Sequence, residues 1–165
     1  MQKKLCIIVP TLNSFKHLSK LILELKKQSK QENWRAIFVD GNSCKEHKEY
    51  LDQITSEDTR FEVMEQSQSG KGIFGAMNEG WKKARRDEWT VFWGSDDWPT
   101  SEKCIESILC AINSQDAEEA ILAIFSGKYV NIEGKEIRTA KFIGVGETSY
   151  IKAEEFRKHI RNGLI

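Results

Sequence analysis

Short apolar runs alternate with helix-like periodicity over the first hundred residues, and this alternation constrains the fold more than any other feature of the sequence. Residues 5–9 (LCIIV) form a continuous apolar run, typical of a strand buried on both faces, and Pro10 closes it. Over residues 15–28, apolar side chains recur at helical spacing with lysines between them. This pattern predicts a strand followed by a helix, with Asn13 or Ser14 available to cap the helix.

The alternation continues and defines the predicted fold class. Further strands are predicted at 34–39, 61–64 and 89–93, with helices through 50–54, over 74–84 and over 101–111. Four residues fall on one face of the third helix: Phe74, Met77, Trp81 and Ala84. The pattern favours an open, mainly parallel α/β sheet with helices on both faces. A late antiparallel hairpin is expected at Glu133-Gly134, and the absence of a linker predicts one domain over 1–165.

Charge balance and cysteine spacing argue against several classes of protein. Lysine and arginine total 25, as do aspartate and glutamate, so no global field would attract nucleic acid, and no nucleic-acid partner is expected. The cysteines show no CxxC pair, so neither a zinc site nor a disulfide framework is expected. These residues are Cys6, Cys44, Cys104 and Cys110. We interpret them as small buried residues or incidental thiols.

Histidines and hydropathy give two further expectations. His17, His47 and His159 have no metal or catalytic-triad spacing, so we expect them at the surface without a role. No apolar run approaches bilayer length, so neither a signal peptide nor a membrane span is expected. The predicted compartment is the cytoplasm.

In an open α/β sheet, ligands bind outside the carboxyl ends of the strands, so the residues just after each strand are the candidate site. These residues are Thr11 and Asn13, Asp40 and Asn42, residues 67–72, and Ser95 to Asp97. Small polar groups and carboxylates can hold a nucleotide, and carboxylate oxygens can hold a metal on its diphosphate. Asp40 could instead serve only as a turn residue in the segment DGNS.

Asp96 and Asp97 end the fourth predicted strand on two adjacent like charges, whose repulsion must be offset. Magnesium or manganese, bound by one carboxylate and by substrate phosphates, would neutralise them and stabilise a nucleoside-diphosphate leaving group. The alternative is a structural role, in which the acids cap the helix that starts near Ser101.

Residues 70–75 match the GxGxxG pattern of a dinucleotide fold, with Asp96 about twenty residues further on. The fingerprint normally turns directly off the first strand, whereas here a polar loop follows the third. An NAD-dependent oxidoreductase is therefore the weaker alternative.

Three segments together carry a family resemblance. CIIVPTLNSFKHLSKLILELKKQ, then WRAIFVDGNS, then GIFGAMNEGWKKARRDEWTVFWGSDDW resemble successive blocks of the family 2 glycosyltransferases of the GT-A fold, particularly bacterial surface-polysaccharide enzymes. The resemblance implies a GT-A-like, Rossmann-like open sheet. It implies that Thr11 and Asp40 hold nucleobase and ribose, that Asp97 binds the metal, and that Asp96 binds the ribose or donor sugar. Further expected contacts with the nucleotide-sugar are Pro10, Asn13, Gly72 and Ser95.

Two departures from the family pattern affect the expected activity. Gly75 stands where related sequences often have aspartate, so any contact of that side chain is missing. In the acceptor half, Glu147 is the carboxylate nearest the place of the family's catalytic base. The chain also stops soon after Gly163, so we expect part of the acceptor-side region to be lacking and turnover to be slower than binding suggests.

The predicted function is transfer of a sugar, with inversion, from a nucleotide-diphosphate sugar to a saccharide or lipid-linked acceptor, with Mn²⁺ or Mg²⁺ as cofactor. The expected location is cytoplasmic, at the inner face of the plasma membrane. The basic segment WKKARRDEW either touches anionic lipid there or is a solvated helix face. A nucleotide-sugar-binding module without transferase activity is the second hypothesis.

Overall fold

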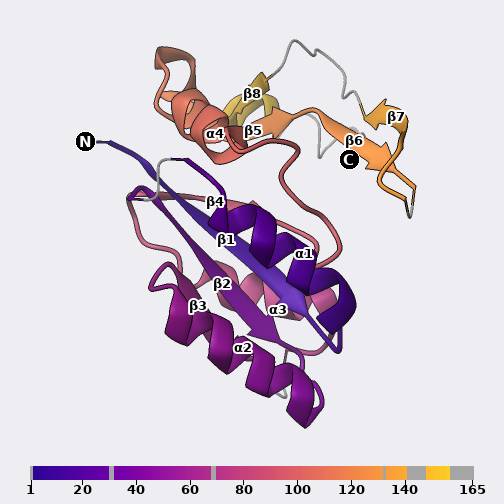
Figure 1. Cartoon of the computed structure of the whole chain (residues 1–165). Helices are drawn as coiled ribbons and strands as arrows, with labels where there is room; N and C mark the ends of the chain where they lie inside the picture. Colours follow the sequence, from indigo (N-terminus) through magenta and orange to yellow (C-terminus); the bar gives the residue numbers. More distant parts are fainter. Residues whose placement is uncertain (1, 30–31, 68–69, 132, 141–147, 157–165) are drawn as a thin grey trace. The chain divides into compact units, whose positions relative to one another are not determined.

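The structure, a computed structural model, describes residues 2–29, 32–67, 70–131, 133–140 and 148–156 (Figure 1). The chain divides into two compact units, Met1–Leu109 and Cys110–Ile165. The first unit contains the strand-end residues that the sequence singles out. The single domain over 1–165 stays a prediction.

The first unit is built on a parallel sheet with strand order β3-β2-β1-β4. Its strands are β1 (Lys4–Thr11), β2 (Trp34–Asp40), β3 (Phe61–Glu65) and β4 (Glu88–Phe92). The two central strands are almost wholly buried because their side chains are apolar on both faces. In the register, Thr11 pairs with Asp40 and Asp40 pairs with Glu65, so three strands end at one edge. The predicted parallel α/β sheet is confirmed.

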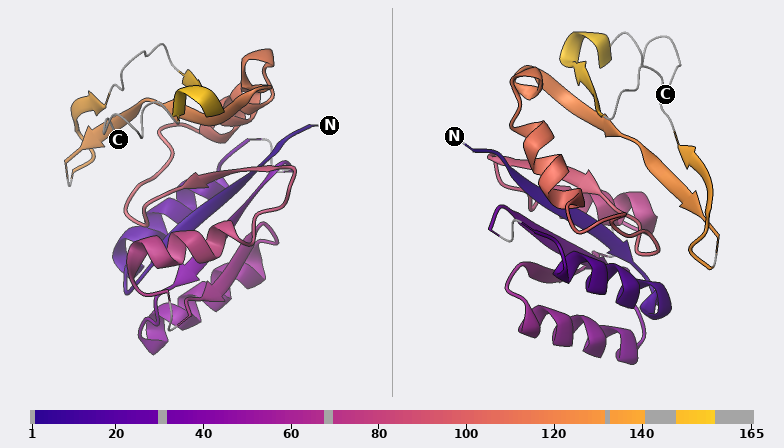
Figure 2. Two further views of the ribbon diagram at one scale, coloured as in Figure 1. Left: turned by 180° about the vertical axis from the view of Figure 1, so that it is seen from behind. Right: turned by 45° about the horizontal axis from the view of Figure 1, so that its top comes forward.

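Helices cover both faces of this sheet, as the alternation predicts (Figures 1 and 2). They are α1 (Phe15–Lys26), α2 (Lys45–Glu57) and α3 (Gly72–Trp81), followed along the chain by α4 (Cys104–Ile112). Helices α1 and α2 lie on one face and α3 on the other. Gln28, just after α1, accepts a hydrogen bond from Ile105 N at 3.0 Å and donates one to Ser101 O at 2.8 Å. This buried amide fixes the start of α4.

The buried face of α3 differs from the predicted one. Phe74 is 83% exposed and Trp81 is 57% exposed, whereas Ala76 and Gly80 are buried. A Cβ added to Gly80 would lie 2.5 Å from Cγ2 of Ile8. The helix therefore packs on the sheet through its smallest residues, because only they allow so close an approach, and the aromatic side chains point away.

The second unit is mainly antiparallel. It contains a short 3₁₀ turn, η1 (Gln115–Ala117), and the strands β5 (Ala120–Phe125), β6 (Gly127–Val130), β7 (Glu136–Ala140) and β8 (Thr148–Lys152). β6 and β7 form the predicted hairpin, and Gly134 in its turn has φ +81°, which favours glycine. β5 pairs with β8, which no local signal predicts. Tyr150 on β8 donates a hydrogen bond to Ala111 O at 2.9 Å.

None of the helices in the described part of the chain is long and apolar enough to cross a bilayer. The four cysteines are free thiols. Cys6 is buried in β1, whereas Cys44 and Cys110 are exposed.

Candidate functional site

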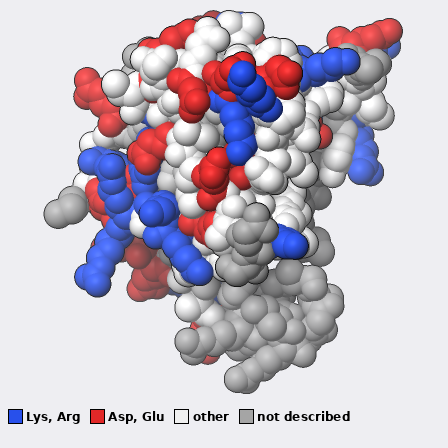
Figure 3. Space-filling model, turned by 90° about the horizontal axis from the view of Figure 1, so that it is seen from below, with Lys and Arg blue, Asp and Glu red and all other residues white. Residues whose placement is uncertain are grey.

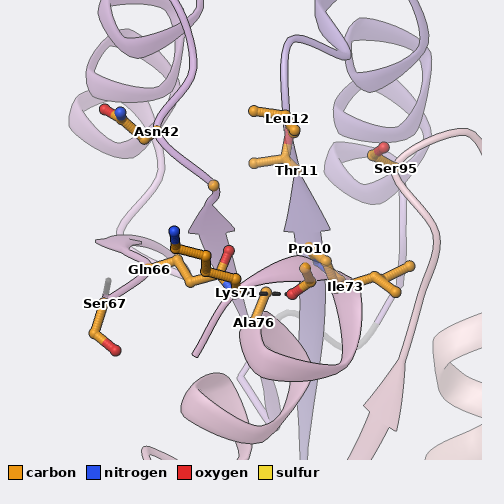
Figure 4. A pocket seen from close by; sticks show the side chains of 12 residues that line it. Pro10, Thr11, Leu12, Asn42, Gln66, Ser67, Lys71, Ile73, Ala76 and Ser95 are labelled. Atoms are coloured by element: carbon orange, nitrogen blue, oxygen red, sulfur yellow. Dashed lines mark hydrogen bonds between the residues drawn. The ribbon is translucent and has the colours of Figure 1, made fainter. Parts of the chain in front are cut away.

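A cavity of about 520 Å³ lies at the carboxyl ends of the parallel strands, where the sequence predicts a ligand site. Each strand of the sheet contributes through the residues that follow it, and the first turns of α3 close one side (Figure 4). The lining residues are Pro10, Thr11, Leu12, Gly41, Asn42, Gln66, Ser67, Lys71, Gly72, Ile73, Ala76 and Ser95. Leu12 and Ile73 are more than half exposed and provide apolar surface at the cavity.

Four of the predicted site residues line this cavity: Pro10, Thr11, Gly72 and Ser95. Gly72 has φ +80°, a conformation that favours glycine and begins α3. Glu147, the predicted catalytic base, lies outside the described residues. The roles assigned to these residues stay predictions.

Asn13 joins two loops and does not line the cavity. Its backbone N–H donates to Ser43 Oγ at 2.9 Å, and its Oδ1 accepts a hydrogen bond from Cys44 N at 2.8 Å. Cys44 is the residue before α2, so Asn13 caps α2 rather than the helix that follows it in sequence. Ser14 occupies the N-cap position of α1 without a capping hydrogen bond. Its hydroxyl lies 2.6 Å from Thr11 Oγ1 instead.

Asp40 ends β2 and is only 1% exposed. Its carboxylate accepts the N–H of Ser43 at 3.1 and 3.3 Å, so it holds the turn between β2 and α2. It lines a second, smaller cavity of about 160 Å³ with residues of α2 and β3. The contacts of Asp40 are therefore those of a turn residue. Its neighbours Gly41 and Asn42 line the main cavity.

His47 lies beneath this edge, and its predicted surface position is wrong. The side chain is 1% exposed, and its Nε2 lies 2.9 Å from Thr11 Oγ1. It falls on the buried face of α2 with Leu51 and Ile54, at the helical spacing that places residues on one side. His17 is exposed as predicted, and His159 lies outside the described residues.

Asp96 and Asp97 follow β4 in a tight turn in which Asp97 N donates to Gly94 O at 3.1 Å. A Cβ added to Gly94 would lie 2.8 Å from both Asp96 Oδ1 and Asp97 Oδ2. The two carboxylates therefore converge over one glycine. Burial first, and then the negative charge of Asp96, raise the pKa of Asp97. Helix α4 begins only at Cys104, so the two acids do not cap it.

This pair of carboxylates fits a divalent cation only in part. The described residues contain no group of three or more metal-binding side chains. Magnesium, however, is commonly held by one or two carboxylates together with substrate phosphates. The convergence of the two acids and the raised pKa of Asp97 are the features that a bound cation would compensate. Asp96 and Asp97 are thus the residues that would hold a metal.

Gln66, which lines the cavity, and Gly75 in α3 both contact the backbone that leads into α3. Gln66 donates from its side chain to Gly70 O and, at 2.8 Å, to Gly72 O. A Cβ added to Gly75 would overlap the carbonyl group of Gly70. The 70–72 backbone therefore occupies the space that a side chain at position 75 would need.

The GxGxxG segment follows β3, which is an edge strand of the sheet, and not a central strand. Six residues separate the end of β3 at Glu65 from the start of α3 at Gly72. The sharp turn directly off the first strand, which a dinucleotide fingerprint requires, is absent from this segment.

Sequence reasoning missed several residues of the site. Gln66, just before the predicted 67–72 loop, was not among the candidates, whereas Lys71 within that loop was a candidate without a specific contact. Asn42 was among the strand-end candidates without a specific role, and it lines the cavity with φ +70°. Leu12 and Ile73 carry no polar signal at all.

The model of the family described as glycosyl transferase family 2 matches residues 6–164. The chain belongs to this family, and its α/β fold is the GT-A fold of the solved structures that it resembles. No curated protein matches the chain.

Two solved proteins illustrate the likeness in fold. Residues 1–349 of TarS from S. aureus superpose with a TM-score of 0.59 at 23% identity, over 67% of this chain and 32% of that one. The mannosyltransferase PcManGT from Pyrobaculum calidifontis, in complex with GDP-Man and Mn²⁺, gives a TM-score of 0.66 at 14% identity, over 78% and 36%. A further TarS structure contains UDP-GlcNAc, with a TM-score of 0.57, 24% identity, and coverage of 67% and 31%. The chain spans about a third of the length of these proteins.

Proposed function

We propose that this chain binds a nucleotide-diphosphate sugar in the cavity at the strand ends and transfers the sugar to a saccharide or lipid-linked acceptor. The observation that carries the proposal is the turn after β4, in which Asp96 and Asp97 converge over Gly94. Ser95, between Gly94 and this acidic pair, lines the cavity. Asp96 and Asp97 themselves do not line the cavity, but the turn that carries them reaches it through Ser95, an arrangement that suits a nucleotide whose diphosphate carries a divalent cation.

The proposed division of labour follows the strand ends. The residues after β1 and β2 hold the nucleoside, with Thr11 and Asn42 offering polar groups. Lys71 offers a positive charge to the diphosphate from the other side. Asp97, with Asp96 beside it, holds Mn²⁺ or Mg²⁺, which supplies charge stabilisation for the departing diphosphate. Donor complexes of the fold neighbours, with UDP-GlcNAc in one and with GDP-Man and Mn²⁺ in another, support this ligand class.

The proposed reaction is a single displacement with inversion. An acceptor hydroxyl loses its proton to a base and attacks the anomeric carbon, while the bond from that carbon to the diphosphate oxygen breaks. Glu147 is the proposed base. The chain's role in this step is to hold the donor's nucleoside and diphosphate still, so that the anomeric carbon stays in line with the incoming hydroxyl.

We further propose that the protein acts in the cytoplasm at the inner face of the plasma membrane, where a lipid-linked acceptor would be met. Exposed Trp81 is followed by two exposed lysines, Lys82 and Lys83, a combination suited to an interfacial contact. On the face seen in Figure 3, however, acidic and basic side chains lie next to one another. Because basic and acidic residues number 25 each over the whole chain, any attraction to anionic lipid is local.

The test is release of nucleoside diphosphate from a panel of UDP-, GDP- and dTDP-sugars with Mn²⁺, with and without saccharide and lipid-linked acceptors. Acceptor-dependent release from one donor is the expected result. Binding of a donor without release, in every acceptor mixture, would favour a nucleotide-sugar-binding module. Binding of NAD(H) in place of every sugar nucleotide would overturn the proposal in favour of an oxidoreductase.

A further inference from the structure

A hydrogen-bonded chain of three side chains, buried at His47 and Thr11 and partly buried at Ser14, connects α2 to the main cavity. The imidazole of His47 lies 2.9 Å from Thr11 Oγ1, and Thr11 Oγ1 lies 2.6 Å from Ser14 Oγ. Thr11, which lines the cavity, is 3% exposed, and His47 is 1% exposed. Nδ1 of His47 is buried and has no hydrogen-bond partner in the described part of the chain.

The unpartnered Nδ1 determines where the imidazole carries its hydrogen. A buried N–H without an acceptor is rarer and more costly than a buried acceptor without a donor. The favoured tautomer is therefore the one with hydrogen on Nε2, in which Nε2–H donates to Thr11 Oγ1 across the 2.9 Å contact. Burial lowers the pKa of His47, against an opposing effect of the Asp40 carboxylate, so the neutral ring is the relevant form.

This donation limits what the Thr11 hydroxyl can do. A threonine hydroxyl has one hydrogen and two acceptor lone pairs. With one lone pair used by His47, and Ser14 Oγ at 2.6 Å, the hydroxyl cannot rotate without losing a buried hydrogen bond. The backbone is held as well, because Gly41 N donates to Thr11 O at 2.8 Å. Thr11 is thus fixed at the cavity by contacts to the residue after β2 and to α2.

We propose that His47 is a positioning residue for the nucleotide, acting through Thr11. It touches no ligand itself, since it does not line the cavity. Its imidazole fixes the orientation of the Thr11 hydroxyl and keeps the loops after β1 and β2 in the arrangement that receives the nucleoside. The inference rests on the proposed function, because it assumes that the cavity takes a nucleotide.

The chemistry of the side chain makes the proposal testable by two substitutions at one position. His47→Leu keeps an apolar body in the buried site but leaves the Thr11 hydroxyl without its donor. His47→Gln can present an amide N–H near the place of Nε2 and restore the hydrogen bond. His17→Gln, on the exposed side of α1, is the matched control.

The experiment measures binding of UDP, GDP and dTDP with Mn²⁺ by calorimetry for the parent chain and the three variants. His47→Leu is expected to weaken binding of the preferred nucleotide by about tenfold, the usual effect of one buried hydrogen bond. His47→Gln is expected to recover most of that loss, and His17→Gln to bind like the parent. Equal binding by His47→Leu and the parent overturns the inference, as does a failure of His47→Gln to exceed His47→Leu.

A spectroscopic measurement on the parent chain covers the case in which His47→Leu does not fold. Long-range ¹H–¹⁵N spectra at pH 7 report which ring nitrogen of each histidine carries hydrogen. The Nε2–H tautomer is expected for His47, with its resonances shifting when the preferred nucleotide is added. An Nδ1–H tautomer, or no shift on saturation, overturns the inference. If the parent binds none of the three nucleotides, the proposed function itself fails, an outcome distinct from equal binding by the variants.

Discussion

Arg35 and Glu88 form a bidentate ion pair that bridges β2 and β4 across the central strand β1. Arg35 Nε donates to Glu88 Oε1 at 2.8 Å, and Nη2 donates to Oε2 at 2.9 Å. Their side chains are 11% and 2% exposed. Arg35 also donates to Glu62 on β3 and to the backbone oxygen of Lys83, both at 2.8 Å. This clamp lies near the amino-terminal edge of the sheet, opposite the cavity, and should stabilise the fold without touching ligand.

Glu88→Gln should therefore lower the free energy of unfolding by about 3 kcal/mol, because it leaves the Arg35 charge largely buried with a weaker partner. Denaturant unfolding measures the loss. Glu57→Gln is the control, since the Lys26–Glu57 pair lies at the surface and its loss should cost far less than that of the buried pair. Equal losses in the two variants would contradict the role given to the clamp.

The same pair predicts a pH dependence of stability. Burial alone would raise the pKa of Glu88, but the hydrogen bonds from Arg35 and from Arg85 N, together with the positive charges of the two arginines, outweigh it, and the pKa is lowered. The stabilisation is therefore present above the ordinary glutamate pKa of 4.5 and is lost as the pH falls through the lowered value. Unfolding curves between pH 7 and pH 3 should lose this contribution in the parent chain and not in Glu88→Gln. If stability fell with pH to the same extent in the parent chain and in Glu88→Gln, the ion pair would not be the source of the pH dependence.

Gly80→Ala should destabilise the first unit although alanine is the better helix former. The added methyl group would meet Cγ2 of Ile8 at 2.5 Å and Cγ2 of Val39 at 3.1 Å. Overpacking of this kind costs about 1–3 kcal/mol, against about 1 kcal/mol gained in helix propensity. Thermal unfolding decides the sign, with Asn78→Ala on the exposed side of α3 as the control. A higher melting temperature for Gly80→Ala would show that α3 can move outward without loss.

Asp97→Asn should have opposite effects on stability and on metal response. Without metal, removing the charge relieves the repulsion from Asp96, so the melting temperature should rise slightly. With Mn²⁺ and nucleotide, the variant should lose the metal-dependent gain because its amide oxygen is a weaker ligand than a carboxylate. Paired melting curves with Mn²⁺ and with EDTA measure both effects. A variant that keeps the full response to Mn²⁺ would remove Asp97 from the metal site.

Asp40→Ala should weaken binding of a nucleoside, which carries no phosphate, to the same degree with and without metal. The substitution removes the acceptor of the Ser43 N–H, so the turn that presents Gly41 and Asn42 to the cavity loosens. Asp52→Ala on α2, beside the same small cavity, is the control. Calorimetry at matched folded fraction, checked by circular dichroism, gives the comparison. Parent-like affinity for the nucleoside, with a loss only for the nucleoside diphosphate in Mn²⁺, would instead place Asp40 at the diphosphate.

Local signals predicted the parallel sheet and much of the cavity. The run at residues 5–9 has apolar side chains on both faces, so the sequence predicts a buried strand there. The first polar residue after this run must then lie at the strand end, and this correctly places Thr11 at the cavity. The hairpin at Gly134 was also predicted from a local turn signal. Pairing of β5 with β8 was not, because the two strands are far apart in sequence and carry no mutual signal.

Side-chain roles that depend on tertiary contacts were harder to predict. His47 has no motif, and only the folded loops bring it to Thr11. The sequence predicts Asn13 as a cap of α1, the helix that follows it. In the fold, the loops after β1 and β2 lie together, and the side chain of Asn13 caps α2 instead. The aromatic residues of α3 suggested a buried face, yet the close approach of helix and sheet selected Ala76 and Gly80.

The measurement that tests the central claim most directly is the melting temperature of the parent chain with UDP, GDP and dTDP, each in Mn²⁺ and in EDTA. The account predicts that at least one nucleotide raises the melting temperature in Mn²⁺ and has little effect in EDTA, because Asp97 and Asp96 repel a diphosphate unless a cation lies between them. At a hundredfold excess over Kd the gain in stability is about 2.7 kcal/mol. Equal stabilisation in Mn²⁺ and EDTA, or stabilisation by NAD(H) alone, would contradict it.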